Sequence, residues 1–199
     1  MVDICSTLGE KADEWGVGTA DMIQFAAAIG MASCSGGPIT SFYTGRPDSW
    51  NPTPLGSMPT ARTNATSMVS LFAAKNFSIT ELVALTGAHT IGRKLDGTPM
   101  DDTIGEWDNN FYNQTAAGSA PGSVAADTFM SQSDETGEEW AKVGQSLEAF
   151  HWAFVPAMEK LSLMGHQKGE LINCSEVVRE YASSAKMMRK MFLKGRRKA

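Results

Sequence analysis

The sequence predicts an all-α fold, and three observations lead to this prediction. Apolar residues recur at helical spacing along most of the chain, almost no segment alternates like a strand, and capping signals precede two of the apolar runs. With 42% hydrophobic and 20% charged residues among 199, the chain can bury a core, and no apolar run approaches the ~20 residues that cross a bilayer. We therefore expect one globular domain over residues 1–180, with no transmembrane segment.

The first half of the chain contains four predicted helices, at 3–15, 19–33, 62–75 and 79–88. The helix at 19–33 is apolar on nearly every side, so it is assigned to the core, with Thr19 as its N-cap. Glycine, proline and serine are frequent between 34 and 59, which indicates an irregular surface loop. The helix at 79–88 begins with the capping box Ser78-x-x-Glu81.

The second half continues with a polar loop at 92–106 and a linker of small residues at 115–127. Helical periodicity then returns at 134–143, 146–163 and 175–194. No internal repeat interrupts this order.

The charge of the chain is distributed unevenly around a formal net value of −5. Seven of the 17 basic residues lie between Lys186 and Lys198, a segment without acids, so we expect a solvated basic extension over 181–199. A nuclear-localisation signal or a membrane-surface patch is the alternative for that segment. The rest of the chain holds all 22 acidic residues against 10 basic ones. An acidic body does not suggest a nucleic-acid enzyme, and we expect no nucleic-acid partner.

Glycosylation sequons predict a secreted protein. Four Asn-x-Ser/Thr sequons occur, at Asn64, Asn76, Asn113 and Asn173. The first residues do not read as a signal peptide, so we expect the original N-terminus to be absent from this chain. The three cysteines, Cys5, Cys34 and Cys174, are an odd number, which implies a free thiol, an intermolecular bridge or a lost partner. Antiparallel packing of the first two helices could bring Cys5 near Cys34.

The string Glu81-Leu-Val-Ala-Leu-Thr-Gly-Ala-His-Thr-Ile91 is the most informative part of the sequence. Its small residues before His89 leave room for a flat object against the imidazole. Taken alone, His89 is more often a hydrogen-bonded core histidine than a ligand. The whole string, however, resembles the proximal-histidine signature of the plant, fungal and bacterial haem peroxidase superfamily. The stretch 20–38, the turn Thr44-Gly-Arg-Pro-Asp48 and residues 99–113 and 129–174 extend the resemblance, which is strongest to secreted fungal peroxidases.

This resemblance implies a haem-peroxidase-like helical fold, mainly its proximal half, and a set of haem contacts. His89 would bind the iron of haem b through one ring nitrogen. Asp134 would accept a hydrogen bond from the other nitrogen, although it could also be an ordinary acid at a helix start. Arg93 and Lys94 would pair with a haem propionate or face water. Met100 would occupy the place where relatives stack an aromatic ring near the imidazole.

The resemblance also implies a calcium site beside the iron ligand. Its members carry oxygen donors at loop-compatible spacing, which Ca²⁺ prefers: Thr90, Asp101, Thr103, Glu106 and Asp108. The two aspartates would supply carboxylates, the threonines hydroxyl and carbonyl oxygens, and the glutamate its carbonyl. A solvated acidic loop is the alternative.

The activity implied is the oxidation of small phenolic donors by hydrogen peroxide, in a monomeric secreted enzyme. Peroxide cleavage in the family needs a distal Arg, two residues, an aromatic residue and His, and neither His151 nor His166 has this context. We therefore expect the N-terminal distal part to be missing. The alternative function is a non-catalytic pseudo-peroxidase that binds haem or calcium, or serves as an interaction surface.

Overall fold

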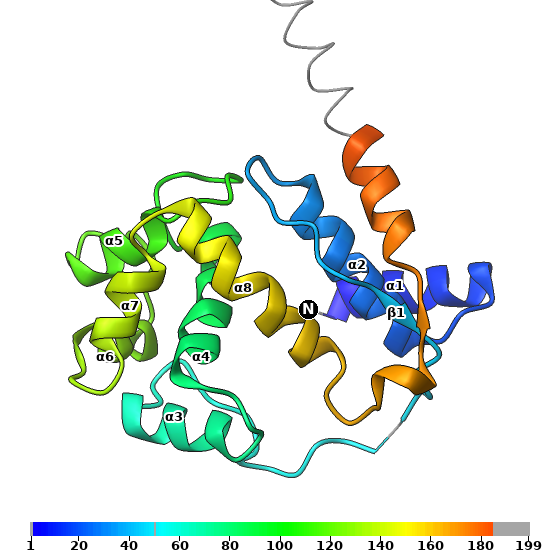
Figure 1. The fold of residues 1–199 in the computed structure, drawn as a ribbon, viewed down its shortest axis with the longest axis horizontal. Helices are drawn as coiled ribbons and strands as arrows, with labels where there is room; N and C mark the ends of the chain where they lie inside the picture. The colour runs from blue at the N-terminus through cyan, green and yellow to red at the C-terminus, as the bar shows by residue number, and fades with distance from the viewer. Residues whose placement is uncertain (1, 50, 185–199) are drawn as a thin grey trace, which may run out of the picture. The chain divides into compact units, whose positions relative to one another are not determined.

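A computed structural model describes residues 2–49 and 51–184 of the chain (Figure 1). These residues are mainly helical, with one two-stranded sheet, which confirms the all-α prediction. They fall into two compact units, one made of residues 2–49 together with 159–184, the other of residues 51–158. A single domain over 1–180 stays a prediction.

The first unit contains two long helices, a small sheet and a further helix. Its elements are α1 (Val2–Trp15), α2 (Thr19–Ser33), β1 (Tyr43–Thr44), η2 (Lys168–Glu170), β2 (Ile172–Asn173) and a helix at 175–184. Strands β1 and β2 are antiparallel, with Tyr43 opposite Asn173. Ala28 of α2, Phe42 and Val178 form the centre of its hydrophobic core. Ala182 is buried in the same core, so the last helix continues past residue 180. Most of the predicted basic extension, 185–199, lies outside the described residues.

A buried ion pair holds the loop after α2 in this unit. The Asp21 carboxylate lies 2.8 Å from Nη1 of Arg46 and accepts hydrogen bonds from Gly45 N at 2.6 Å and Thr44 Oγ1 at 2.8 Å. Burial alone would raise the pKa of Asp21, but these hydrogen bonds outweigh it and the pKa is lowered. The guanidinium also donates to the carbonyl of Ser162, so three segments distant in sequence meet at Arg46.

The N-terminus of α2 is capped by a residue far along the chain. The N-cap is Gly18 rather than the predicted Thr19, and it has no side chain to accept a hydrogen bond. The amides of Thr19 and Ala20 instead donate to the Asp48 carboxylate, at 2.9 and 2.7 Å. Tertiary structure therefore supplies the cap that local sequence was expected to provide.

The second unit is a bundle of short helices. Its elements are α3 (Ala65–Ala73), α4 (Ile79–Thr86), η1 (Gly87–Ile91), α5 (Asn110–Ala116), α6 (Ala125–Gln132), α7 (Gly137–Val143) and most of α8 (Leu147–Ser162). In Figure 1, α5, α6 and α7 group beside α4. The core between them is largely aromatic: Trp107, Phe111, Tyr112, Trp140, Phe150 and Phe154 are each at most 2% exposed. Edge-to-face and stacked ring pairs join these side chains, which favours one rigid arrangement around α4.

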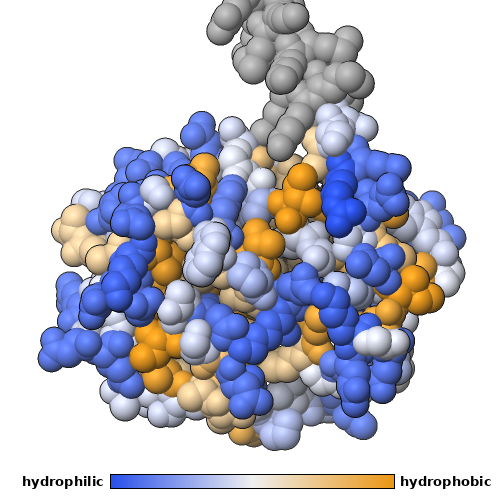
Figure 2. Space-filling model, viewed as in Figure 1, coloured by the Kyte–Doolittle hydropathy of each residue, from blue (hydrophilic) through white to orange (hydrophobic). Residues whose placement is uncertain are grey.

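The predicted elements agree with these except in one region. The predicted helices from 3–15 to 146–163 all have counterparts, but α5 and α6 were not expected: 115–127 was assigned as a linker, and the flanking residues 107–114 and 128–133 were assigned no helix. The three cysteines form no disulfide bond. No helix within the described ranges is long and apolar enough to cross a membrane, and Figure 2 shows hydrophobic residues only in separate small groups on the face in view.

Candidate functional site

His89 stands where α4 tightens into the 3₁₀ turn η1. Helix α4 starts with the predicted capping box, in which Ser78 Oγ accepts from Glu81 N at 3.1 Å and the Glu81 carboxylate accepts from Ser78 N at 2.8 Å. In the following turn, the apolar residues Leu82 and Val83 are almost completely buried. The cap fixes where the helix begins and the buried turn packs it in the core, so the chain reaches His89 from an anchored helix.

Tyr112 and Gly87 shape the turn that carries the histidine. The Tyr112 hydroxyl donates to the carbonyls of Val83 and Ala84, at 3.0 and 3.3 Å. A side chain at Gly87 would overlap this hydroxyl and the Phe150 ring. Burial raises the pKa of Tyr112 well above its usual value, so the hydroxyl stays a donor. Only glycine lets α4 approach the aromatic core this closely.

The imidazole of His89 is held from one side by a buried carboxylate. Nδ1 lies 3.1 Å from each carboxylate oxygen of Asp127, a residue of α6 that is 2% exposed. A carboxylate accepts hydrogen bonds, so Nδ1 is the donor in this contact, and in the neutral imidazole Nε2 then keeps the lone pair. Phe111 packs edge-to-face on the imidazole, with ring centroids 5.6 Å apart.

The other side of the imidazole remains accessible. Nε2 makes no hydrogen bond within the described part of the chain, and 43% of the His89 side chain is exposed. A neutral imidazole with one nitrogen anchored to a buried carboxylate and the other available is the arrangement in which histidine binds a metal.

The prediction that Asp134 accepts the hydrogen bond from His89 is wrong in this structure. Helix α6 ends at Gln132, so Asp134 falls in the loop before α7 and is exposed. Asp127 lies on α6 itself, and its carboxylate also accepts from Val124 N at 3.3 Å. Sequence reasoning missed Asp127 and Phe111 because both belong to helices that it did not predict.

The predicted calcium residues come together as a chain of hydrogen bonds. Thr90 Oγ1 donates to Asp101 at 2.7 Å, and the amide of Thr103 donates to the other Asp101 oxygen at 3.1 Å. Asn110 connects Thr103 to Asp108, donating to Thr103 Oγ1 at 3.4 Å and, through its backbone amide, to Asp108 Oδ1 at 2.8 Å. Glu106 is exposed and follows on the same loop, its amide donating to the Thr103 carbonyl.

The chemistry of this cluster fits a hard cation. Asp101 is fully buried and forms no ion pair with a described residue. Burial raises the pKa of its carboxyl, and the nearby Asp108 carboxylate raises it further. Within residues 2–49 and 51–184, no three or more His, Cys, Asp or Glu side chains are grouped so that they could hold a metal. An ion at this cluster would therefore also need hydroxyl and carbonyl oxygens as ligands.

The remaining predicted contacts lie on the loop after η1. Arg93 is exposed and donates to the Gly97 carbonyl at 3.1 Å, whereas Lys94 is half-buried. Met100 is 4% exposed, and its amide donates to Gly92 O at 3.1 Å, which places it beside the turn that carries His89. The aromatic ring that contacts the imidazole is Phe111, not a residue at position 100.

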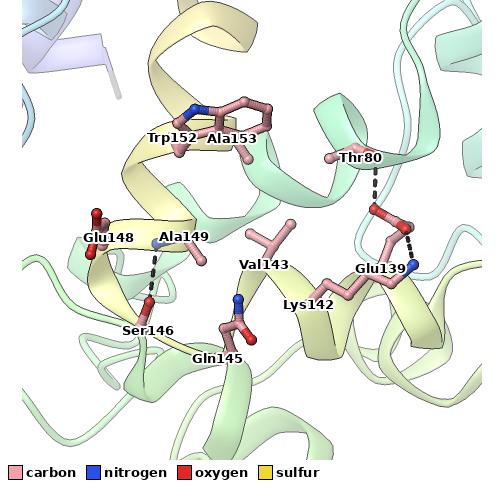
Figure 3. Close-up of a pocket in the computed structure, with 10 residues that line it drawn as sticks. All are labelled: Thr80, Glu139, Lys142, Val143, Gln145, Ser146, Glu148, Ala149, Trp152 and Ala153. Carbon is pink, nitrogen blue, oxygen red and sulfur yellow. Dashed lines mark hydrogen bonds and ion pairs between the residues drawn. The ribbon is translucent and has the colours of Figure 1, made fainter.

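A separate pocket of about 450 Å³ opens between α4, α7 and α8 (Figure 3). Trp152 covers one wall, and Val143 and Ala153 form apolar surface inside it. On another wall Glu139 accepts hydrogen bonds from Lys142 and from Thr80, both at 2.8 Å. None of the residues predicted to bind haem or calcium lines this pocket.

Comparison with known proteins matches the profile of the peroxidase family to residues 1–146. The chain is 31% identical over 186 residues to versatile peroxidase VPS1 of Pleurotus eryngii, covering 81% of this chain and 50% of that protein. It is 32% identical to manganese peroxidase 3 of Phlebia radiata, covering 80% and 51%. The low-redox potential peroxidase of Taiwanofungus camphoratus is 31% identical, with 89% and 61% covered. The chain thus spans about half the length of the first two of these relatives.

Proposed function

Because the chain belongs to the peroxidase family, we propose that it binds haem b through His89 and takes part in the peroxide-dependent oxidation of small phenolic donors. One observation carries the proposal. The buried Asp127 carboxylate holds Nδ1 of His89, while Nε2 has no partner in the described chain and the side chain is 43% exposed. Bound haem would supply the redox chemistry.

The residues around His89 have distinct roles in this proposal. Asp127 accepts the hydrogen bond from Nδ1–H, fixes the tautomer and makes Nε2 a stronger donor to a metal. Phe111 fixes the plane of the ring. Gly87, together with the Tyr112 hydroxyl, holds the end of α4 against the aromatic core. Arg93, which is exposed, and Lys94 remain candidates to pair with a propionate of the bound group.

Haem titration tests the proposal. His89→Ala should abolish stoichiometric haem binding, seen as the loss of the Soret band, while far-ultraviolet circular dichroism keeps its helical signal. An unchanged Soret spectrum in the variant would rule His89 out as the ligand. Wild-type protein with a Soret band and turnover of a phenol supports the enzyme, and a band without turnover supports the non-catalytic haem-binding alternative.

We also propose a Ca²⁺ site formed by Thr90, Asp101, Thr103, the Glu106 carbonyl and Asp108. The support is the buried Asp101 carboxylate, which forms no ion pair with a described residue, the Asp108 carboxylate near it, and the Thr90 and Thr103 hydroxyls that donate to Asp101. Because Thr90 directly follows His89, a bound ion would brace the histidine turn. Isothermal titration with calcium checks this site, and Asp101→Asn should remove the binding signal.

Extracellular localisation is proposed for the native protein. The support is that all four sequon asparagines are exposed: Asn64, Asn76, Asn113 and Asn173. Expression through a fungal secretory pathway, followed by endoglycosidase treatment, should lower the apparent mass in a gel. A mass that does not change on treatment would show that the sequons are not used.

A further inference from the structure

We propose that the pocket between α4, α7 and α8 binds a small aromatic amine in its protonated form, independently of haem and calcium (Figure 3). Its volume of about 450 Å³ falls within the range of about 300–1,000 Å³ that small-molecule sites occupy. All of its lining residues belong to one unit of the chain, so the pocket is complete within that unit.

An aromatic ring is the part of the ligand that the apolar wall would take. Trp152 is 81% exposed and lines the pocket, whereas Trp107 and Trp140 are buried. Val143 and Ala153, 3% and 7% exposed, add apolar surface. An indole held at the wall of a pocket offers an aromatic ring a stacking surface and offers a cation the electron-rich face.

The charges of the pocket select a cation. Lys142 is the basic residue of the lining, and its ammonium is paired with Glu138 and Glu139, each at 2.8 Å. Those carboxylates raise the pKa of Lys142, so the pair persists at neutral pH. Glu139 also accepts from Thr80, and its own pKa is lowered by the hydrogen bonds from Lys142 and Thr80.

Glu148 provides a carboxylate that is still available. It lies one helical turn before Trp152 on α8, is exposed, and makes no hydrogen bond or ion pair within the described residues. Gln145 also lines the pocket (Figure 3), and its side-chain amide can form a further hydrogen bond with a polar ligand group. An ammonium group one or two carbons from an aromatic ring could reach Glu148 while the ring lies on Trp152, whereas an anion would meet the uncompensated carboxylate.

Three probes with the same ring test this proposal: benzylamine, benzyl alcohol and benzoate. We expect benzylamine to bind the 199-residue chain about two- to fivefold more tightly than benzyl alcohol in low salt, because an exposed ion pair adds a gain in affinity of about this size. Benzoate should bind more weakly than the alcohol. The higher affinity for the amine should shrink in 1 M salt, because the electrostatic screening length then falls to ~3 Å. Isothermal titration and ligand-observed NMR measure the affinities.

Two variants and two controls assign the site. Glu148→Gln should bring the affinity for benzylamine down to that for benzyl alcohol and leave the alcohol unchanged. Trp152→Leu should weaken benzylamine binding about two- to fivefold. The controls are Glu135→Gln, another exposed carboxylate, and Trp15→Leu, another exposed tryptophan, and neither should change binding. Equal affinities for the three probes, or equal effects of Glu148→Gln and Glu135→Gln, would overturn the proposal.

Discussion

Replacing Asp127 with Asn isolates the charge that holds the histidine. Asn has nearly the same shape and can still accept from Nδ1, so the 3.1 Å contact can survive while the negative charge is lost. Losing an outer-shell partner of a metal-binding histidine typically weakens metal affinity about 10–100-fold. That factor corresponds to about 1.4–2.8 kcal/mol, which agrees with the ~1.5–3 kcal/mol of a hydrogen bond to a charged group.

The assay is titration of ferric haem followed at the Soret band, with Asp134→Asn as the matched control. We expect Asp127→Asn to weaken haem binding about 10–100-fold. Asp134→Asn should change it less than about twofold, because substitution of an exposed residue rarely matters. Circular dichroism checks that α6 is intact in both variants. The reasoning is refuted if Asp134→Asn weakens binding while Asp127→Asn does not, since the hydrogen bond would then belong to Asp134.

Three further predictions concern the calcium loop, Gly87 and Asp21. Chelation of calcium should lower the melting temperature of the wild type, since saturation at 100 times Kd adds about 2.7 kcal/mol to the folded state, and Asp108→Ala should be insensitive to chelator. Gly87→Ala should destabilise the chain by about 1–3 kcal/mol in urea unfolding, because its Cβ overlaps the aromatic core. The control Gly9→Ala, in open space within α1, should stabilise it by about 0.5–1 kcal/mol. Asp21 has a lowered pKa in the folded chain, so its stabilising effect is complete above its unfolded pKa of about 4 and is lost as the pH falls through the folded pKa. Asp21→Asn should therefore reduce the acid sensitivity of stability below about pH 4, and an identical pH profile in wild type and variant would contradict this.

Signals that act within a few residues were readable from the sequence. The capping box from Ser78 to Glu81 and the apolar helix at 19–33 depend on neighbours along the chain, and the structure shows both of them. The all-α class followed for the same reason, since helical periodicity is a local property. His89 was identified as a site residue because the whole string around it matched a known signature.

The partners of those residues depended on tertiary structure. The α2 cap comes from Asp48, about thirty positions beyond the helix start, and no local pattern marks a carboxylate that acts at such a distance. The same holds for the histidine. The assignment to Asp134 came from matching a motif, but which carboxylate meets Nδ1 depends on where α6 begins and ends, and the small-residue segment before it hid that helix from periodicity. Packing of α5 and α6 around η1 brings Phe111 and Asp127 to His89, and only the folded chain shows that contact.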